Sequence, residues 1–287
     1  MSRRGQRTLA VLAVAGTGFL GASVVVGARE LLRRQAAAAR RVIGKPLGEQ
    51  APAADRIWKR SYGDPVALLV LGDSIAAGLG AERRKDTLGA RLAKGVARTL
   101  HRAVDLRVAA VVGSESSALP LQLDGLPRLY RADVAVIVVG GNDVTHRVPV
   151  ADSVAFLVAA IERLRADGTE VVVGTCPDLG ALRPVPQPLR SLGSRASRQL
   201  AAAQAAAARE AGAYVVSLAD VVGPFFVTNP DEMFSLDRFH PSALGYRRTA
   251  EAMLPSVLAA LGHRQEMPFG HHRPAVEAPE APEGPEA

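Results

Sequence analysis

Between residues 65 and 261, short apolar runs alternate with longer segments in which apolar residues recur at helical spacing. Unbroken apolar runs are typical of strands covered on both faces, and a 3.6-residue period is typical of amphipathic helices. This pattern predicts five strands and four main helices. The strands are expected at 65–71, 104–112, 133–139, 170–175 and 213–218, and the helices at 87–102, 149–167, 190–211 and 242–261. Strands separated by helices favour one α/β domain whose parallel sheet carries helices on both faces.

The N-terminal end differs from this domain. Residues 8–28 form an uncharged run of 21 residues with arginines on both sides. At 1.5 Å per residue such a helix is about 31 Å long, which is enough to cross a bilayer core. The sequence therefore predicts that residues 1–28 are either a retained signal anchor or a cleaved signal peptide.

The flanking segments complete the predicted organisation. Residues 29–64 read as a basic juxtamembrane and linker segment, and residues 263–287 as a disordered tail rich in Pro, Glu and Ala. The folded domain is then expected at 65–262.

The charge distribution narrows the choice of partners. The formal net charge is +7, but residues 1–60 hold twelve Lys and Arg against three acidic residues, which leaves a net charge of −2 for the rest. A folded nucleic-acid-binding domain would carry its basic residues on its own surface, so we expect no nucleic-acid partner. We expect membrane contact through residues 8–45 instead.

Two features of the sequence favour opposite locations of the domain relative to that membrane. More arginines follow the apolar run than precede it, which favours a cytoplasmic domain, whereas the signal-like layout favours export. We expect export to the cell envelope or secretion, with a cytoplasmic-facing anchor as the alternative. The one cysteine, Cys176, excludes an internal disulfide and is expected to be a buried thiol.

Candidate chemistry lies in the loops that follow the predicted strands, because ligands bind at the carboxyl ends of parallel strands. Gly72-Asp73-Ser74 follows the first strand, and Gly113 follows the second. A serine needs a base before it becomes a good nucleophile. Each of these two loops, taken alone, is also typical of an ordinary turn.

Two further loops are more specific. Gly140-Gly141-Asn142-Asp143 follows the third strand, and the Asn142 amide is a neutral donor of the kind that stabilises an oxyanion. Asp237 precedes His240 by three residues, just before the last helix. A carboxylate at that spacing can hold one imidazole nitrogen while the other faces a serine.

In their order and spacing, these four loops resemble the blocks of the SGNH (GDSL-type) hydrolase family, over residues 65–261. The resemblance implies a three-layer α/β/α sandwich of flavodoxin-like type with five parallel strands. It implies Ser74 as nucleophile, His240 as base and Asp237 as the orienting acid. It also implies an oxyanion hole formed by the Ser74 N–H, the Gly113 N–H and the Asn142 side chain, and no cofactor or metal.

The function implied by the resemblance is hydrolysis of carboxylic esters, with small or lipid-derived acyl esters preferred. Carbohydrate O-acetyl esterase or thioesterase activity on the same site is an alternative. A metal-dependent phosphoesterase that uses Asp73, Asn142, Asp143 and His240, and a tethered binding module without activity, are less favoured. The apolar stretch 224–236 is either an acyl-binding wall or a loop packed on the core.

Overall fold

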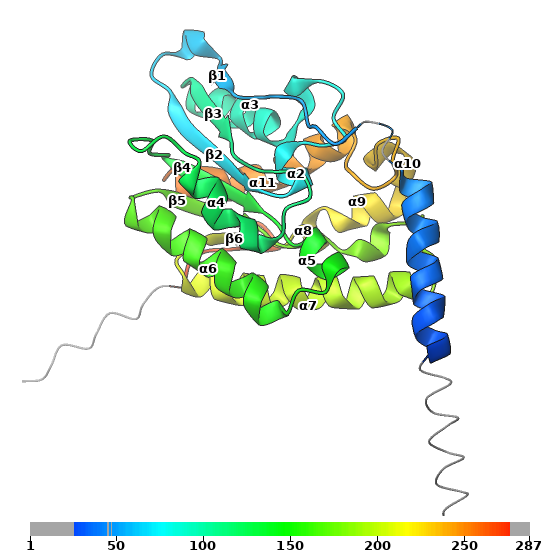
Figure 1. The fold of residues 1–287 in the computed structure, drawn as a ribbon. Coiled ribbons are helices and arrows are strands. Elements are labelled where there is room, and N and C mark those ends of the chain that lie inside the picture. The colour runs from blue at the N-terminus through cyan, green and yellow to red at the C-terminus, as the bar shows by residue number, and fades with distance from the viewer. Residues whose placement is uncertain (1–25, 45, 47, 276–287) are drawn as a thin grey trace, which may run out of the picture.

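The computed structural model describes residues 26–44, 46 and 48–275 (Figure 1). Most of the predicted signal segment, and the tail from residue 276 onward, lie outside these residues. Within the described part of the chain, no helix has both the length and the apolar character needed to cross a membrane.

The centre of the domain is a seven-stranded sheet with the order β1-β3-β2-β4-β5-β6-β7. Its five parallel strands are the five predicted from the apolar runs: β2 (Val66–Gly72), β3 (Val104–Val108), β4 (Val134–Val138), β5 (Glu170–Gly174) and β6 (Tyr214–Val216). The prediction of a purely parallel, five-stranded sheet is corrected by two short antiparallel strands at the edges, β1 (Arg56–Trp58) and β7 (His271–His272).

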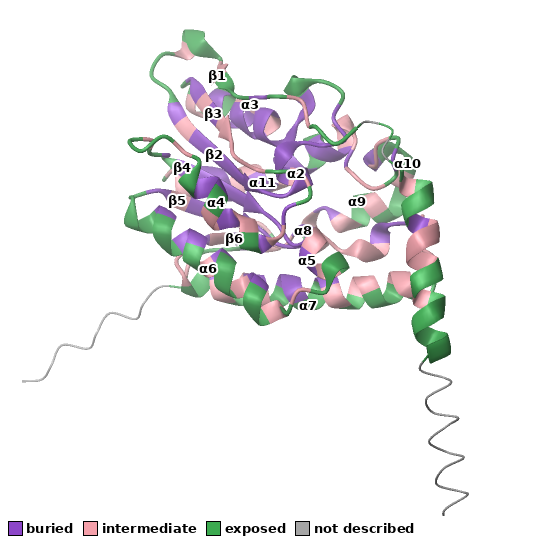
Figure 2. Cartoon of the chain, viewed as in Figure 1, coloured by how far each residue is buried: buried purple, intermediate pink, exposed green. Residues whose placement is uncertain are grey.

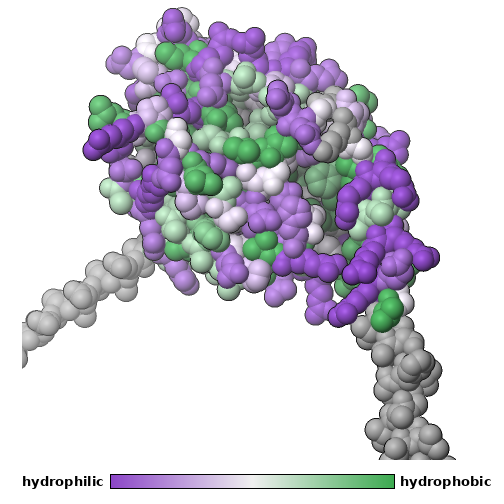
Figure 3. All heavy atoms as spheres, viewed as in Figure 1, coloured by the Kyte–Doolittle hydropathy of each residue, from purple (hydrophilic) through white to green (hydrophobic). Residues whose placement is uncertain are grey.

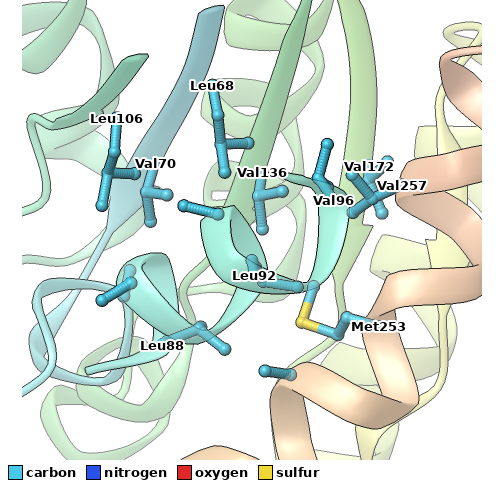
Figure 4. Close-up of a cluster of buried hydrophobic side chains, with 14 of the residues drawn as sticks. Leu68, Val70, Leu88, Leu92, Val96, Leu106, Val136, Val172, Met253 and Val257 are labelled. Atoms are coloured by element: carbon cyan, nitrogen blue, oxygen red, sulfur yellow. The ribbon is translucent and has the colours of Figure 1, made fainter. Parts of the chain in front are cut away.

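Alternate residues of each buried strand face opposite helical layers. From β2, Leu68 and Val70 pack among side chains of α3 (Leu88–Leu100) and α11 (Ala243–Ala260) (Figure 4). Leu69 of the same strand points to the other face, which is covered by α4 (Leu119–Asp124), α6 (Val150–Ala166) and α7 (Leu189–Glu210). Burial of one such side chain contributes about 2 kcal/mol, and the strands are buried on both faces (Figure 2). The expected three-layer sandwich is confirmed.

Short helices occupy the loops at the carboxyl end of the sheet and around it. They are α2 (Ser74–Ala77), α5 (Gly141–His146), α8 (Leu218–Val221), α9 (Gly223–Thr228) and α10 (Pro230–Met233), with 3₁₀ turns at Arg60–Tyr62, Arg84–Asp86, Ser116–Ala118 and Leu179–Ala181.

The chain on both sides of the predicted domain is part of the fold. In β1, Arg56 pairs with Leu106 of β3, although this segment was predicted to be a linker. Past residue 262, His271 is buried and its Nδ1 lies 2.8 Å from the Ser256 Oγ on α11. The prediction of disorder from residue 263 is therefore wrong for the segment up to residue 275. Side-chain and edge-strand contacts hold this segment, and its polar composition does not reveal them.

A helix over residues 26–43 leads into the domain. The Leu189 N–H at the start of α7 donates to the Gln35 Oε1 at 3.1 Å, and the Gln35 Nε2 donates to the Gln187 carbonyl. Ala39 on the same side of the helix is buried. The predicted juxtamembrane segment is thus helical and packs on the domain at the start of α7 (Figure 1).

Candidate active site

Ser74 lies at the sharp turn between β2 and α2. Gly72, the last residue of β2, has φ 129°, and a Cβ there would lie 1.9 Å from the Val138 carbonyl oxygen of β4. Only glycine permits this close approach of the two strands. Asp73 then caps α2 by accepting the Ile75 N–H at 2.9 Å, which places Ser74 in the first position of the helix.

His240 approaches Ser74 from the loop before α11. Its Nε2 lies 3.0 Å from the Ser74 Oγ, and its Nδ1 lies 2.6 Å from the Asp237 Oδ2. The turn that brings the acid and the imidazole together contains Arg238 in the left-handed region, with φ 56°. The three predicted side chains therefore form one continuous line of hydrogen bonds, although Ser74 and His240 are 166 residues apart.

Four hydrogen bonds hold the Asp237 carboxylate. Besides the imidazole at Oδ2, its Oδ1 accepts from the Ser235 hydroxyl at 2.8 Å and from the backbone N–H groups of Phe239 and His240, both at 2.9 Å. Burial on its own would raise the pKa of Asp237, but the imidazole and the other donors outweigh it and lower that pKa to about 2. The carboxylate is ionised throughout the neutral range.

The two other predicted oxyanion donors differ in position. Asn142, on α5, borders the same cavity as Ser74 and His240, and its Nδ2 donates to the Ser114 carbonyl at 2.9 Å. That bond uses one of its two N–H groups and leaves one for a ligand. Gly113, with φ 84°, lies in the adjoining loop after β3 and is not among the residues that line the cavity.

Asp143 is a residue to which the sequence analysis gave no role in ester hydrolysis. It is buried, and its carboxylate accepts the Ser116 N–H at 3.1 Å and the Ser153 hydroxyl at 2.7 Å. Nearby, the His146 Nδ1 lies 2.7 Å from the Glu115 Oε1. These contacts tie α5 to the loop that carries Gly113. The only signal for Asp143 in the sequence was its place directly after Asn142.

Gln122 of α4 is a second residue that the sequence did not indicate. Its side chain donates to the Gly72 carbonyl at 2.8 Å and accepts the Gly72 N–H at 2.9 Å. It thereby holds the backbone immediately before Asp73 and Ser74.

The cavity beside Ser74 has a volume of about 80 Å³ and mostly apolar walls. Phe226 and Phe234, from the stretch predicted as an acyl-binding wall or a packed loop, line it and contact each other edge to face, with ring centroids 4.9 Å apart. The sequence did not indicate another part of the lining. It comes from the loop after β5, and its apolar residues are Pro177, Leu179, Ala181 and Leu182.

The two carboxylates of the alternative metal site already accept hydrogen bonds from groups of the protein. Asp73 accepts the Ile75 N–H, and Asp143 accepts the Ser116 and Ser153 donors. Burial raises the pKa of Asp73 to about 6. Cys176, which follows β5, is buried, and burial raises the pKa of its thiol well above the usual range. The geometry favours a serine nucleophile over either a metal ion or a thiolate.

The model of the GDSL-like lipase/acylhydrolase family matches residues 70–248 of the chain. The chain belongs to this family. It is 36% identical over 281 residues to the GDSL-like esterase Rv1075c of Mycobacterium tuberculosis, with 94% of this chain and 89% of the relative covered. The similarity thus includes residues on both sides of the region matched by the family model, and the protein is a serine esterase of the GDSL type.

Solved structures show the same fold for this GDSL-type chain. The lipase Lip_vut3 from a goat rumen metagenome superposes with a TM-score of 0.55 at 20% identity, over 70% of this chain and 99% of that one. TesA gives a TM-score of 0.52 at 26% identity, over 68% and 99% of the two chains. The esterase EstA from Pseudoalteromonas sp. gives 0.54 at 19% identity, over 68% and 98%.

Proposed function

We propose that this GDSL-type esterase cleaves carboxylic esters with Ser74 as nucleophile, His240 as general base and Asp237 as the acid that orients the imidazole. The observation that supports this most directly is the line of contacts from the Ser74 Oγ to the His240 Nε2 at 3.0 Å and from the His240 Nδ1 to Asp237 at 2.6 Å. Because Asp237 is ionised, it favours the tautomer with a proton on Nδ1, which leaves Nε2 free to accept the serine proton.

The reaction follows in two steps. The Ser74 Oγ attacks the ester carbonyl as its proton moves to the His240 Nε2, and the tetrahedral intermediate collapses when the alcohol leaves with that proton. Water then repeats the sequence on the acyl-serine ester and releases the carboxylic acid. The free Asn142 N–H and the Ser74 backbone N–H are the proposed oxyanion donors, with the Gly113 N–H as a third.

The acyl group is proposed to occupy the apolar cavity. The cavity has a volume of about 80 Å³, and its apolar lining includes Phe226, Phe234 and Leu182. This small volume supports a short acyl chain.

The test uses p-nitrophenyl esters of increasing acyl length. We expect kcat/KM to be highest for short acyl chains and to fall for chains of twelve carbons. Ser74→Ala should abolish turnover and labelling by a fluorophosphonate probe, whereas Ser61→Ala, on an exposed turn away from the cavity, should change neither. Full esterase activity in Ser74→Ala would refute the assignment of the nucleophile. A rate that climbs steadily to sixteen carbons would refute the short-chain proposal alone.

A further inference from the structure

Two helices that touch carry a local excess of basic residues. The helix over residues 26–43 and α7 together hold nine arginines against Glu30 and Glu210, a formal charge of +7 that equals the net charge of the whole protein. The charge count over residues 1–60 places the excess positive charge at the N-terminus alone and does not include α7.

The helix over residues 26–43 contacts the start of α7 through Gln35. Gln35 is bonded to Gln187 and Leu189 at the start of α7, so α7 begins at the level of Gln35. Residues 26–34 extend about 13 Å beyond that level, and the end of the helix passes α7 on the side away from the sheet (Figure 1). The described chain therefore begins on the outer side of α7.

Four arginines occupy this region, which we call the arginine face: Arg29, Arg33, Arg34 and Arg195. All four are exposed. Figure 3 shows hydrophilic side chains gathered over the helix and along the adjoining lower edge of the domain. Within the face, Leu31 and Leu192 are each about half exposed, at 48% and 49%.

We propose that the arginine face docks on an anionic lipid surface. Three observations point to lipid. The charge is complementary to anionic headgroups, two leucines project among the arginines as in helices that lie at a membrane interface, and the uncharged run of residues 8–28 leads directly into the face. Docking would fix the orientation of the domain, because Gln35 couples the helix to the loop that ends at Gln187. The same loop lines the acyl cavity through Leu182.

The test measures the proximity of α7 to lipid in the full chain. A fluorophore is attached at Ala202→Cys, on the exposed side of α7, and at Thr99→Cys, on α3 across the sheet, as the matched control. The native Cys176 is fully buried, which directs labelling to the new cysteine. Vesicles contain headgroup-quencher lipids and either phosphatidylcholine alone or phosphatidylcholine with one third phosphatidylglycerol.

We expect quenching at position 202 with phosphatidylglycerol, little with phosphatidylcholine alone, and none at position 99 with either. The double variant Arg33→Gln/Arg195→Gln, with one change on each helix, should weaken the phosphatidylglycerol-dependent association at least tenfold, since each arginine at an anionic surface contributes about fivefold. Arg60→Gln/Arg98→Gln makes the same charge change elsewhere and should leave that association unchanged.

Equal quenching at both positions, no quenching at either, or an unaltered response in the Arg33→Gln/Arg195→Gln variant would overturn the proposal. So would duplex DNA that releases position 202 from the vesicles at equal phosphate concentration, because the face would then be a nucleic-acid site. Docking does not depend on hydrolysis. The Ser74→Ala protein should dock as the wild type does, and a failure of docking is distinguishable from a failure of the triad assignment.

Discussion

Replacement of Asp73 by asparagine tests how the fold tolerates a buried carboxylate beside the reactive serine. Asp73 is 2% exposed, and burial raises its pKa from an ordinary 3.8 to about 6. Between about pH 4 and pH 6 the folded state therefore holds more protons than the unfolded state. Stability that is present below pH 4 is lost as the pH rises through 6.

The size of this loss follows from the two pKa values. A difference of about 2 in pKa corresponds to about 3 kcal/mol once both states are ionised. Asparagine has nearly the same shape and keeps an oxygen for the Ile75 N–H, but it carries no charge. We expect Asp73→Asn to raise the free energy of unfolding by about 1–3 kcal/mol at pH 7.5 and to leave it nearly unchanged at pH 3.5.

The assay is urea unfolding followed by circular dichroism at pH 3.5, 5 and 7.5. Asp64→Asn, at an exposed position, is the matched control and should shift neither end of the range. Two results would show that the ionised Asp73 carboxylate does not destabilise the fold. The variant would be less stable than the wild type at pH 7.5, or its free energy of unfolding would fall with pH as steeply as that of the wild type.

Three further substitutions test the site. Asp237→Asn should lower kcat about 10⁴-fold in ester kinetics, because the imidazole loses the partner that fixes its tautomer. It should also lower stability at neutral pH, because the lowered pKa of Asp237 shows that its ionised form stabilises the fold. Asp143→Ala, measured by ester kinetics beside the milder Ser153→Ala, should lower kcat up to about 10²-fold and leave KM nearly unchanged, because the loop of Gly113 loses its support. Gly72→Ala should lower the melting temperature by several degrees in a thermal scan, because the new Cβ meets the Val138 carbonyl 1.9 Å away.

Each of these results has an outcome that contradicts its premise. Near-normal turnover in Asp237→Asn would remove the acid from the proposed triad. A rise in KM alone in Asp143→Ala would place this residue in substrate binding and not in support of the loop. An unchanged melting temperature in Gly72→Ala would mean that β2 and β4 separate at little cost.

The parallel core and the line from Ser74 to His240 were predictable from the sequence because each has a local signature. Unbroken apolar runs mark strands buried on both faces, and glycine-containing loops mark their carboxyl ends. The topology of a parallel sheet then brings these loops to one edge. Asp237 and His240 are three residues apart, so their contact required no knowledge of the rest of the fold.

What the sequence did not reveal depends on contacts between distant segments. The pairs Asp143–Ser116 and Gln122–Gly72 join residues that are 27 and 50 positions apart, and no local pattern marks either side. The docking of the helix over residues 26–43 uses Gln35 and the buried Ala39, and neither stands out within an alanine-rich stretch. The loop after β5 lines the cavity, but its composition does not differ from that of other loops that contain Pro and Leu.

The strand β7 has a consequence for any shortened form of this enzyme. Its two residues cover Val215 and Val216 of β6, and the Gly270 carbonyl just before it accepts the Ser217 N–H at 2.8 Å. A chain that ends at Gly262 would leave the backbone N–H and C=O groups along that side of β6 without these partners, next to a core of β-branched residues. An open strand of this kind recruits strands from other molecules, so such a chain is expected to self-associate, whereas one that ends at Ala275 is not.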